Sequence, residues 1–355
     1  MNMLVDGEWR TDAFQTTDES GAFTRQTTTF RNEIRDDHDA RFQPEAGRYH
    51  LYVSYACPWA HRTLLVRALK GLEDVLSVSV VDPYRGEDGW QFTPEKAGCT
   101  EDHVHGAEYL RELYVRADPE ATCRVTVPVL WDTAKDTIVN NESEEIIRML
   151  DSEFDDLATR DVDLYPEGYR DEIDRIIEDI YEPINNGVYR AGFATKQEPY
   201  DEAIDELFSA LEHWDGVLAD QRYLAGDRLT LADICLFTTL VRFDQVYHTH
   251  FMCNVQFIRE FDHLWPYVRD LYQTGVSDHR EETPNARAGN SPTQKTSVSD
   301  TVDMDHIKEH YYTTHPDVTP SGIIARGPDL DLEAAHDRDE LPGEPPGALV
   351  TASSD

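Results

Sequence analysis

The stretch YHLYVSYACPWAHRTLLVRALKGLEDVLSVSVV, residues 49–81, decides the fold. It begins as a β-rich run and continues with apolar residues at helical spacing, up to a natural helix stop at Gly71. The run VLSVSVV at 75–81 then alternates as a second strand. A strand, a helix and a strand within so short a segment predict a right-handed βαβ unit with parallel strands.

The residues after this unit predict a second sheet-forming segment and then a change to helices. VTVPVLWD at 125–132 and DTIVNN at 136–141 predict a hairpin, and SEEIIRMLD at 143–151 predicts a helix. Beyond a linker near 152–168, several long segments carry apolar residues three and four positions apart, which is typical of amphipathic helices. The expected fold class is therefore α/β plus all-α.

These patterns divide the chain into six predicted segments. They are an N-terminal arm at 1–48, an α/β domain at 49–151 with an insertion at 83–122, an all-helical domain at 165–274, a flexible linker at 275–303, a C-terminal element at 304–330 and a disordered tail at 331–355. The arm is polar and irregular, and the chain contains no internal repeat.

The charge balance excludes some classes of partner. The chain has 70 Asp and Glu against 32 Lys and Arg, a formal net charge of −38. So acidic a surface repels phosphate backbones and anionic lipid, which argues against nucleic-acid and membrane binding. Either acidic patches meet a cationic partner or a carboxylate-covered surface suits strong salt. The even spread of charge and the scarcity of lysine favour the second explanation.

Cysteine usage and hydropathy indicate the compartment. Five cysteines without paired spacing do not predict a disulfide framework. The N-terminal MNMLVDGEWR has no basic region followed by an apolar run, and no stretch reaches the length of a membrane span. We therefore expect a cytoplasmic protein in a reducing setting.

Cys57 is the residue most strongly marked for chemistry. It follows a predicted strand and opens a predicted helix, with Pro58 in the first turn. Unpaired backbone N–H groups and the positive end of the helix dipole favour a thiolate there, so we expect a depressed pKa. The alternative is a buried structural cysteine. Because Ala60 occupies the position of a second redox cysteine, Cys57 must form mixed disulfides that an external thiol resolves.

Two further motifs could bind an amino-acid-like ligand. The Val127-Pro128 bond begins a strand, where a proline indicates a special turn, a cis bond or an edge strand. Glu142 and Ser143 in NNESEEII lie at the start of a helix, where a carboxylate, a hydroxyl and free amides can bind an amino-acid head group. Ser143 could equally serve only as a helix cap.

Two other clusters are assigned no catalytic role. Thr230 and Asp233 in TLAD predict a capping box that serves folding. His248, His250 and Cys253 could be taken for metal ligands, but no fourth ligand accompanies them, so no metal site is expected.

Seven motifs, taken in order, resemble the glutathionyl-hydroquinone reductases, which are the Xi class of glutathione transferases. The motifs are CPWAHR at 57–62, GEDGWQF at 86–92, VTVPVLWD at 125–132, NNESEEIIRML at 140–150, INNGVYRAGFA at 184–194, LTLADICLF at 229–237 and RFDQVYHTHF at 242–251. The resemblance extends from about residue 20 to about residue 330 and includes MDHIKEHYYTTHP at 304–316. It implies an N-terminal thioredoxin-like, thiol-binding domain followed by a helical glutathione-transferase domain, with the 304–330 element packed near the active site.

The resemblance implies a role for each matching residue in the thioredoxin-like domain. Cys57 matches the catalytic cysteine, and Trp90 matches the aromatic residue that covers the bound thiol peptide. Val127 matches the residue that pairs with the cysteinyl backbone. Glu142 and Ser143 match the residues that hold the γ-glutamyl group.

The resemblance also implies a quinol site and an assembly. Tyr189 and Tyr247 match tyrosines around the quinol, and Tyr311 is the expected third, with Tyr312 as the alternative. The partners implied are a small quinol thioether and a low-molecular-weight thiol. A homodimer is implied, with no bound cofactor and no metal.

The reaction implied is the removal of glutathione from a glutathionyl-hydroquinone. The Cys57 thiolate attacks the thioether sulfur, tyrosine hydroxyls assist the leaving hydroquinone, and a second thiol resolves the mixed disulfide. If the acidic surface indicates a salt-loving archaeal host, γ-glutamylcysteine could replace glutathione, because both thiols share the γ-glutamyl end.

Three other functions remain in competition. A glutaredoxin-like deglutathionylase would use Cys57 but would not need Tyr189 or Tyr247. A non-catalytic transferase-fold module would need no reactive thiol at all. Conjugation of glutathione to electrophiles is less favoured, because that chemistry uses a Ser or Tyr in place of a competing protein cysteine.

Overall fold

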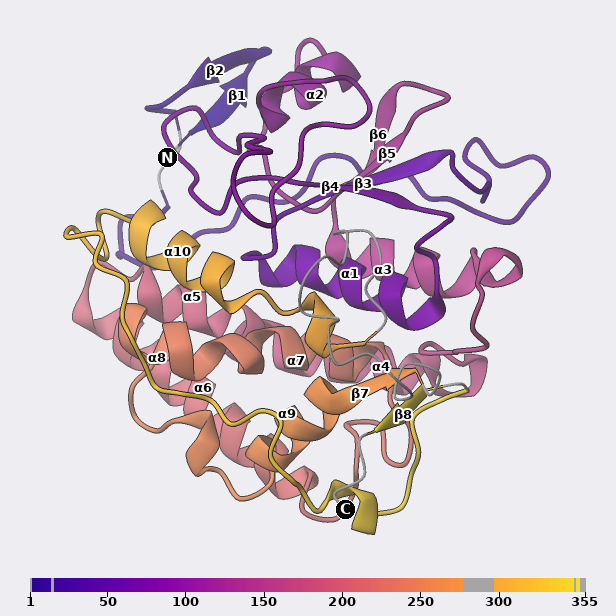
Figure 1. Cartoon of the computed structure of the whole chain (residues 1–355). Helices are drawn as coiled ribbons and strands as arrows, with labels where there is room; N and C mark the ends of the chain where they lie inside the picture. Colours follow the sequence, from indigo (N-terminus) through magenta and orange to yellow (C-terminus); the bar gives the residue numbers. More distant parts are fainter. Residues whose placement is uncertain (1, 14–15, 277–296, 348, 352–355) are drawn as a thin grey trace.

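The computed structural model describes residues 2–13, 16–276, 297–347 and 349–351 (Figure 1). Figure 1 shows the α/β part of the chain, in indigo and purple, lying over the helical part, in pink and orange. The order of elements confirms the predicted fold class, an α/β module followed by an all-helical region.

A four-stranded sheet in the order β4-β3-β5-β6 forms the centre of the α/β module. β3 (Tyr49–Val53) pairs in parallel with β4 (Ser77–Val80), and α1 (Pro58–Lys70) connects them. β5 (Val129–Asp132) pairs antiparallel with both β3 and β6 (Thr137–Asn140). The βαβ unit and the hairpin expected from the sequence are therefore both present.

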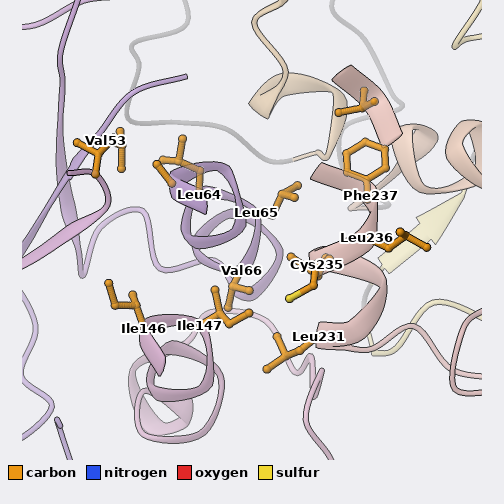
Figure 2. Packing of buried hydrophobic residues seen from close by; sticks show 14 of the residues in the cluster. Val53, Leu64, Leu65, Val66, Ile146, Ile147, Leu231, Cys235, Leu236 and Phe237 are labelled. Atoms are coloured by element: carbon orange, nitrogen blue, oxygen red, sulfur yellow. The ribbon is translucent and has the colours of Figure 1, made fainter. Parts of the chain in front are cut away.

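α1 lies between the sheet and the helical domain. On one side it packs with α3 (Ser143–Ser152), and on the other it contacts α7 (Leu231–Arg242). Figure 2 shows apolar side chains of α1, among them Leu64, Leu65 and Val66, between residues of β3, α3 and α7. Because α1 is covered on every side, it is the element through which the two domains share one core.

The helical domain follows a short connection that contains two 3₁₀ turns, Asp155–Leu157 and Glu167–Tyr169. Its elements are α4 (Arg170–Ile180), the π-helical turn Tyr181–Asn185, α5 (Gly187–Gly192), α6 (Gln197–Val217), α7, the π-helical turn Phe243–Tyr247, α8 (His248–His250), the 3₁₀ turn Ile258–Glu260 and α9 (Leu264–Gln273). α10 (Met304–Thr314) returns to the boundary between the two domains (Figure 1).

Asp233 organises the start of α7. Its buried carboxylate accepts hydrogen bonds from the Thr230 N–H at 2.8 Å, the Leu224 N–H at 2.9 Å and the Tyr267 hydroxyl at 2.9 Å. Burial nevertheless raises the pKa of Asp233 to about 6. All of these contacts join loops and helices to one another, which is the folding role expected for this motif.

The segment expected as an arm runs along the α/β module. Its hairpin of β1 (Met3–Val5) and β2 (Glu8–Arg10) lies beside α2 (Leu110–Ala117), the helix of the insertion (Figure 1). The Leu4 N–H donates to the Cys123 carbonyl at 2.9 Å, and the Cys123 N–H donates back at 3.1 Å. Backbone hydrogen bonds thus attach the arm to the α/β module.

The C-terminal segment corrects one expectation. We expected residues 331–355 to be disordered, but the described part contains the 3₁₀ turn Arg338–Glu340 and β8 (Leu349–Thr351), which pairs with β7 (Thr274–Val276). The buried Arg338 guanidinium donates to the Leu218 carbonyl at 2.6 Å. The prediction was wrong here because a polar, Pro- and Gly-rich composition conceals a few anchoring residues, among them Arg338 and the buried Leu332.

The remaining expectation about organisation concerns 275–303. Residues 277–296 of that predicted linker lie outside the described residues. Its described end forms the 3₁₀ turn Ser299–Thr301, where the Thr301 hydroxyl pairs with His61 Nε2 at 2.7 Å. No helix in the described part of the chain is both long enough and apolar enough to cross a membrane.

Candidate active site

A cavity of about 360 Å³ lies where the arm, the α/β module and the helical domain meet. It is lined by Phe23, Arg25, Gln26, Thr27, Thr28, Cys57, Trp59, Arg85, Trp90, Arg124, Val125, Thr126, Val127, Pro128, Asn141, Glu142, Ser143, Tyr181, Glu182, Asn186, Tyr189, Phe193, His310 and His315. Six of the eight residues predicted for the site are in this set: Cys57, Trp90, Val127, Glu142, Ser143 and Tyr189.

Cys57 sits at the N-cap position of α1, between β3 and the helix. Its Sγ donates a hydrogen bond to the Val127 carbonyl at 3.5 Å. Burial raises the pKa of the Cys57 thiol, and the N–H groups of Ala60 and Trp59 oppose this only in part, together with the nearby cations Arg242 and Arg25. The expected depression of the pKa is therefore wrong for this cavity, because desolvation outweighs the helix terminus.

Arg242 fixes the backbone that carries Cys57. It is fully buried at the end of α7, and its guanidinium donates to the carbonyls of Ala56 and Tyr55, both at 3.0 Å. The same guanidinium bonds His61 Nδ1 at 2.9 Å. A side chain of the helical domain thus sets the loop from which the thiol projects.

The predicted γ-glutamyl site lies at the start of α3. Glu142, not Ser143, occupies the N-cap position, and its side chain accepts no N–H of the first turn, nor does that of any other described residue. The Glu142 carboxylate accepts from the Thr28 hydroxyl of the arm at 3.1 Å. The first-turn N–H groups therefore remain available to a carboxylate in the cavity, which favours the ligand interpretation of this motif over the cap.

Val127 and Trp90 approach the cavity from two other segments. The Val127-Pro128 bond is cis, one of the conformations considered from the sequence. Trp90 is buried in the insertion, and its ring stacks against His310 of α10, with centroids 5.1 Å apart and planes 20° from parallel. The aromatic wall of the cavity thus joins the insertion to the late helix.

The three predicted tyrosines form one hydrogen-bonded chain. The Tyr189 and Tyr311 hydroxyls are 2.5 Å apart, and the Tyr311 and Tyr247 hydroxyls are 3.0 Å apart. Tyr189 lines the cavity, while Tyr247 and Tyr311 stand behind it. The alternative residue Tyr312 instead donates to the Gln245 carbonyl at 3.1 Å, so Tyr311 is the third member.

The contribution of the arm to the cavity is not predicted by the sequence. Phe23, Arg25, Gln26, Thr27 and Thr28 form one wall of the cavity. Arg25 bonds Asn186 Oδ1 at 3.0 Å, and its guanidinium lies 4.8 Å from the Trp59 ring and 5.2 Å from the Tyr189 ring. No periodicity marks this stretch, and a lone arginine in a polar segment was the only available signal.

Three arginines give the cavity a positive lining in a strongly acidic protein. They are Arg25, Arg85 and Arg124. Burial lowers the pKa of Arg85 to about 10. Burial, together with the charges of the other two arginines, lowers the pKa of Arg124 to about 9. Nε and one terminal nitrogen of Arg85 have no hydrogen-bond partner among the described residues. Such a lining suits an anionic ligand.

The histidine and cysteine residues weighed as metal ligands do not converge. His248 stacks on Phe257, His250 bonds His315, and the buried Cys253 thiol donates to the Val188 carbonyl at 3.9 Å. Within the described ranges, no group of three His, Cys, Asp or Glu side chains is arranged to hold a metal.

Two family models match the chain. The glutathione S-transferase N-terminal domain matches residues 56–153, and the glutathione S-transferase C-terminal domain matches residues 197–274. The first match contains Cys57, Trp90, Val127, Glu142 and Ser143 of the cavity lining, whereas no lining residue lies within the second.

Proteins from three organisms are similar to the chain. The glutathionyl-hydroquinone reductase PcpF of Sphingobium chlorophenolicum is 46% identical over 92% of this chain and 96% of its own. The glutathionyl-hydroquinone reductase YqjG of Escherichia coli is 45% identical over 96% and 99%. Its structure with glutathione bound superposes with a TM-score of 0.81 at 43% identity, over 95% and 99% of the two chains. A Xi-class transferase from Natrialba magadii is 72% identical over 97% and 98%, with a TM-score of 0.86.

Proposed function

The chain belongs to the Xi class of glutathione transferases and is an enzyme of the glutathionyl-hydroquinone reductase class, and on this premise we propose that Cys57 carries its reaction. Cys57 takes the thiol from a glutathionyl-hydroquinone, and free hydroquinone leaves. Of the five cysteines, all within the described residues, Cys57 alone lines the cavity, and the other four are buried. That observation carries the proposal.

The thiol peptide is proposed to lie along the α/β side of the cavity. Its γ-glutamyl carboxylate meets the first turn of α3, and its ammonium group meets Glu142, with Ser143 beside it. Its cysteinyl backbone lies along Val127, and Trp90 covers it. The charge of Arg85 and Arg124 suits the carboxylate at its other end.

The proposed reaction has two steps. The first cleaves the thioether of the conjugate, and the second is a thiol–disulfide exchange. The conjugate reacts as its keto tautomer, in which the proton of the hydroxyl adjacent to the carbon–sulfur bond has moved to the ring carbon. The Cys57 thiolate attacks the sulfur, the carbon–sulfur bond breaks, and its electron pair passes through the ring to the adjacent oxygen, which takes a proton. The ring is reduced, and Cys57 is left in a mixed disulfide. A second thiolate attacks that disulfide, which forms the small disulfide and returns the Cys57 thiolate.

The tyrosine chain has a direction that suits proton donation into the cavity. Tyr247 is fully buried, and its hydroxyl meets the hydroxyls of Tyr311, at 3.0 Å, and of Tyr189. Hydrogen bonds from Tyr311 and Tyr247 both act to lower the pKa of Tyr189, although burial raises that pKa overall. We therefore infer that Tyr311 and Tyr247 donate toward the Tyr189 oxygen, and the Tyr189 proton is left for the ligand. We assign Tyr189 as the donor to the leaving hydroquinone and the other two as its positioning residues.

The physiological thiol is proposed to be glutathione or γ-glutamylcysteine. Both share the γ-glutamyl end that Glu142 and Ser143 would hold. The proposal further includes a homodimer in a salt-rich cytoplasm, working without a bound cofactor or metal. Sedimentation in high salt tests the assembly directly, and a monomeric active enzyme would exclude the dimer.

Intact-protein mass spectrometry tests the central step. The protein is incubated in high salt with 2-glutathionylhydroquinone and no second thiol, and peptide mapping then locates any adduct. We expect one glutathionyl group on Cys57, which added thiol removes. Cys57→Ser abolishes the adduct and turnover, whereas the matched control Cys253→Ser retains both. Turnover that persists in the Cys57→Ser variant contradicts the proposal.

A further inference from the structure

His310 presents one fixed hydrogen-bond acceptor to the cavity. Its Nδ1 lies 2.7 Å from the Pro83 carbonyl. A carbonyl oxygen can only accept, so Nδ1 carries the hydrogen and Nε2 does not. The Thr314 hydroxyl is 3.4 Å from the same nitrogen, which is too long to compete. Stacking on Trp90 holds the plane of the ring.

The His310 ring is neutral, so its Nε2 keeps a lone pair. Burial, with a smaller contribution from the charge of Arg85, lowers the pKa of His310 to about 4. Nε2 has no hydrogen bond to any described residue, although the side chain lines the cavity. An acceptor left without a partner in a ligand cavity is one that a ligand can satisfy.

The tautomer of the neighbouring His315 is not fixed in this way. Its Nδ1 pairs with His250 Nε2 at 3.0 Å, and His250 Nδ1 pairs with the Thr319 hydroxyl at 2.8 Å. A hydroxyl can donate or accept, so this chain leaves both tautomers open. The cavity thus has a donor in Tyr189 and an acceptor of fixed tautomer in His310.

Resting on the proposed function, we propose that His310 is a specificity-determining residue that accepts a hydrogen bond from the hydroquinone hydroxyl remote from the carbon–sulfur bond. The two oxygens of the substrate have different needs. The oxygen adjacent to the carbon–sulfur bond gains negative charge as the electron pair enters the ring, so it needs a donor, which Tyr189 supplies. The remote oxygen keeps its proton, so it needs an acceptor, which His310 supplies.

The test compares 2-glutathionylhydroquinone with 2-glutathionylphenol, which lacks the remote hydroxyl. The two conjugates differ in intrinsic reactivity, but that difference is the same for every variant. The diagnostic quantity is therefore the ratio of their kcat/KM values. In wild type we expect the hydroquinone conjugate to be favoured, and in His310→Phe we expect the ratio to fall about tenfold. Phenylalanine preserves the stack on Trp90 and opens no space.

His306→Phe is the matched control. His306 lies one turn earlier on α10, and its Nε2 bonds the Ala97 carbonyl at 2.7 Å, in the same insertion that His310 contacts. It does not line the cavity. If loosening the insertion were the cause, both variants would change the ratio.

The possible outcomes distinguish a failure of this inference from a failure of the proposed function. A ratio lowered in His310→Phe and unchanged in His306→Phe supports the inference, and restoration by His310→Gln, whose amide oxygen can accept, strengthens it. An unchanged ratio in His310→Phe, with wild type active, overturns the inference alone. A wild type inactive on 2-glutathionylhydroquinone, with no adduct on Cys57, overturns the proposed function and the inference that rests on it.

Discussion

Cys57 experiences two opposing influences at the start of α1. The Ala60 and Trp59 N–H groups and the positive charges of Arg242 and Arg25 favour the thiolate, while the surrounding protein removes the water that would solvate it. Desolvation prevails in the cavity without a ligand, and the pKa of the thiol lies above its ordinary value. The residue that performs the chemistry is thus held mostly as the thiol at neutral pH.

This balance predicts a strongly pH-dependent thiol. Because a raised pKa leaves little thiolate at neutral pH, the rate of Cys57 alkylation by iodoacetamide should rise about tenfold per pH unit from pH 7 and should not level off below pH 8.5. Arg25→Gln removes a favourable charge and should move the profile to higher pH, and Arg25→Lys should restore it. A plateau near pH 7 in wild type would show that the helix terminus prevails over burial.

The direction of the tyrosine chain predicts an ordered series of variants. Tyr189→Phe removes the donor itself and should lower kcat/KM on the hydroquinone conjugate about a hundredfold. Tyr311→Phe removes only a positioning hydrogen bond and should lower kcat/KM about tenfold. Tyr312 bonds the Gln245 carbonyl instead, so Tyr312→Phe should leave kcat/KM unchanged. Activity on glutathione mixed disulfides should change little in all three. Full activity of Tyr189→Phe on both substrate types would instead favour the deglutathionylase alternative, which does not need the tyrosines.

At the scale of elements, α10 completes the site by docking on the insertion. His310 bonds the Pro83 carbonyl, His306 bonds the Ala97 carbonyl, and Glu309 pairs with Lys96. The same helix brings Tyr311 to Tyr189. One short helix therefore holds Trp90 against the cavity and positions Tyr189, the proposed proton donor.

The local elements were predictable because their signals lie within a few residues. Cys57 before Pro58 marked the β3–α1 junction, and the residues of NNESEEII marked the start of α3. Both patterns follow from backbone geometry alone, without knowledge of the rest of the molecule.

What could not be predicted depends on contacts between distant segments. Tyr311 and Tyr312 are adjacent in the sequence, and only the docking of α10 decides which of them meets Tyr189. Arg25 acquires a place in the cavity because the arm crosses to Asn186, a contact that no local pattern encodes. The raised pKa of Cys57 likewise arises from burial by segments far away in the chain.

The folded C-terminal segment predicts a stability effect without an activity effect. Arg338 donates to the Leu218 carbonyl at 2.6 Å and to the Arg222 carbonyl at 2.9 Å, and it is 2% exposed. Arg338→Met leaves these carbonyls without a donor, so the free energy of unfolding should fall by about 3 kcal/mol. Denaturant titration measures the change, and the exposed neighbour Asp339→Asn serves as control. Activity below the transition should remain, because no residue of 331–347 lines the cavity.

For the whole molecule, the net charge of −38 sets the conditions under which it is stable. Like charges across the surface repel one another, and this repulsion reaches about 10 Å at 0.1 M salt but only about 3 Å at 1 M. The acidic surface therefore opposes folding in dilute buffer, whereas at high salt the repulsion is screened and has little effect on stability.

Thermal unfolding should show this dependence. The midpoint should rise steeply between 0.1 and 2 M KCl, as measured by circular dichroism. The variant Glu202→Gln/Asp205→Asn/Glu212→Gln removes three charges from the exposed face of α6, none of them in an ion pair with a described residue. Its midpoint should be higher at low salt and should rise less with KCl. If the midpoint of the variant rises with KCl as steeply as that of wild type, specific ion binding, and not charge repulsion, causes the salt dependence.

The position of the cavity walls along the chain has a consequence for synthesis. Arg25 lies in a segment that is translated before the elements of both domains, and His315 directly follows α10. The enclosure around Cys57 is therefore incomplete until residue 315 has been translated and α10 has docked. A nascent chain carries an open thiol without its aromatic cover or its tyrosine partner, and becomes a selective enzyme only when α10 docks.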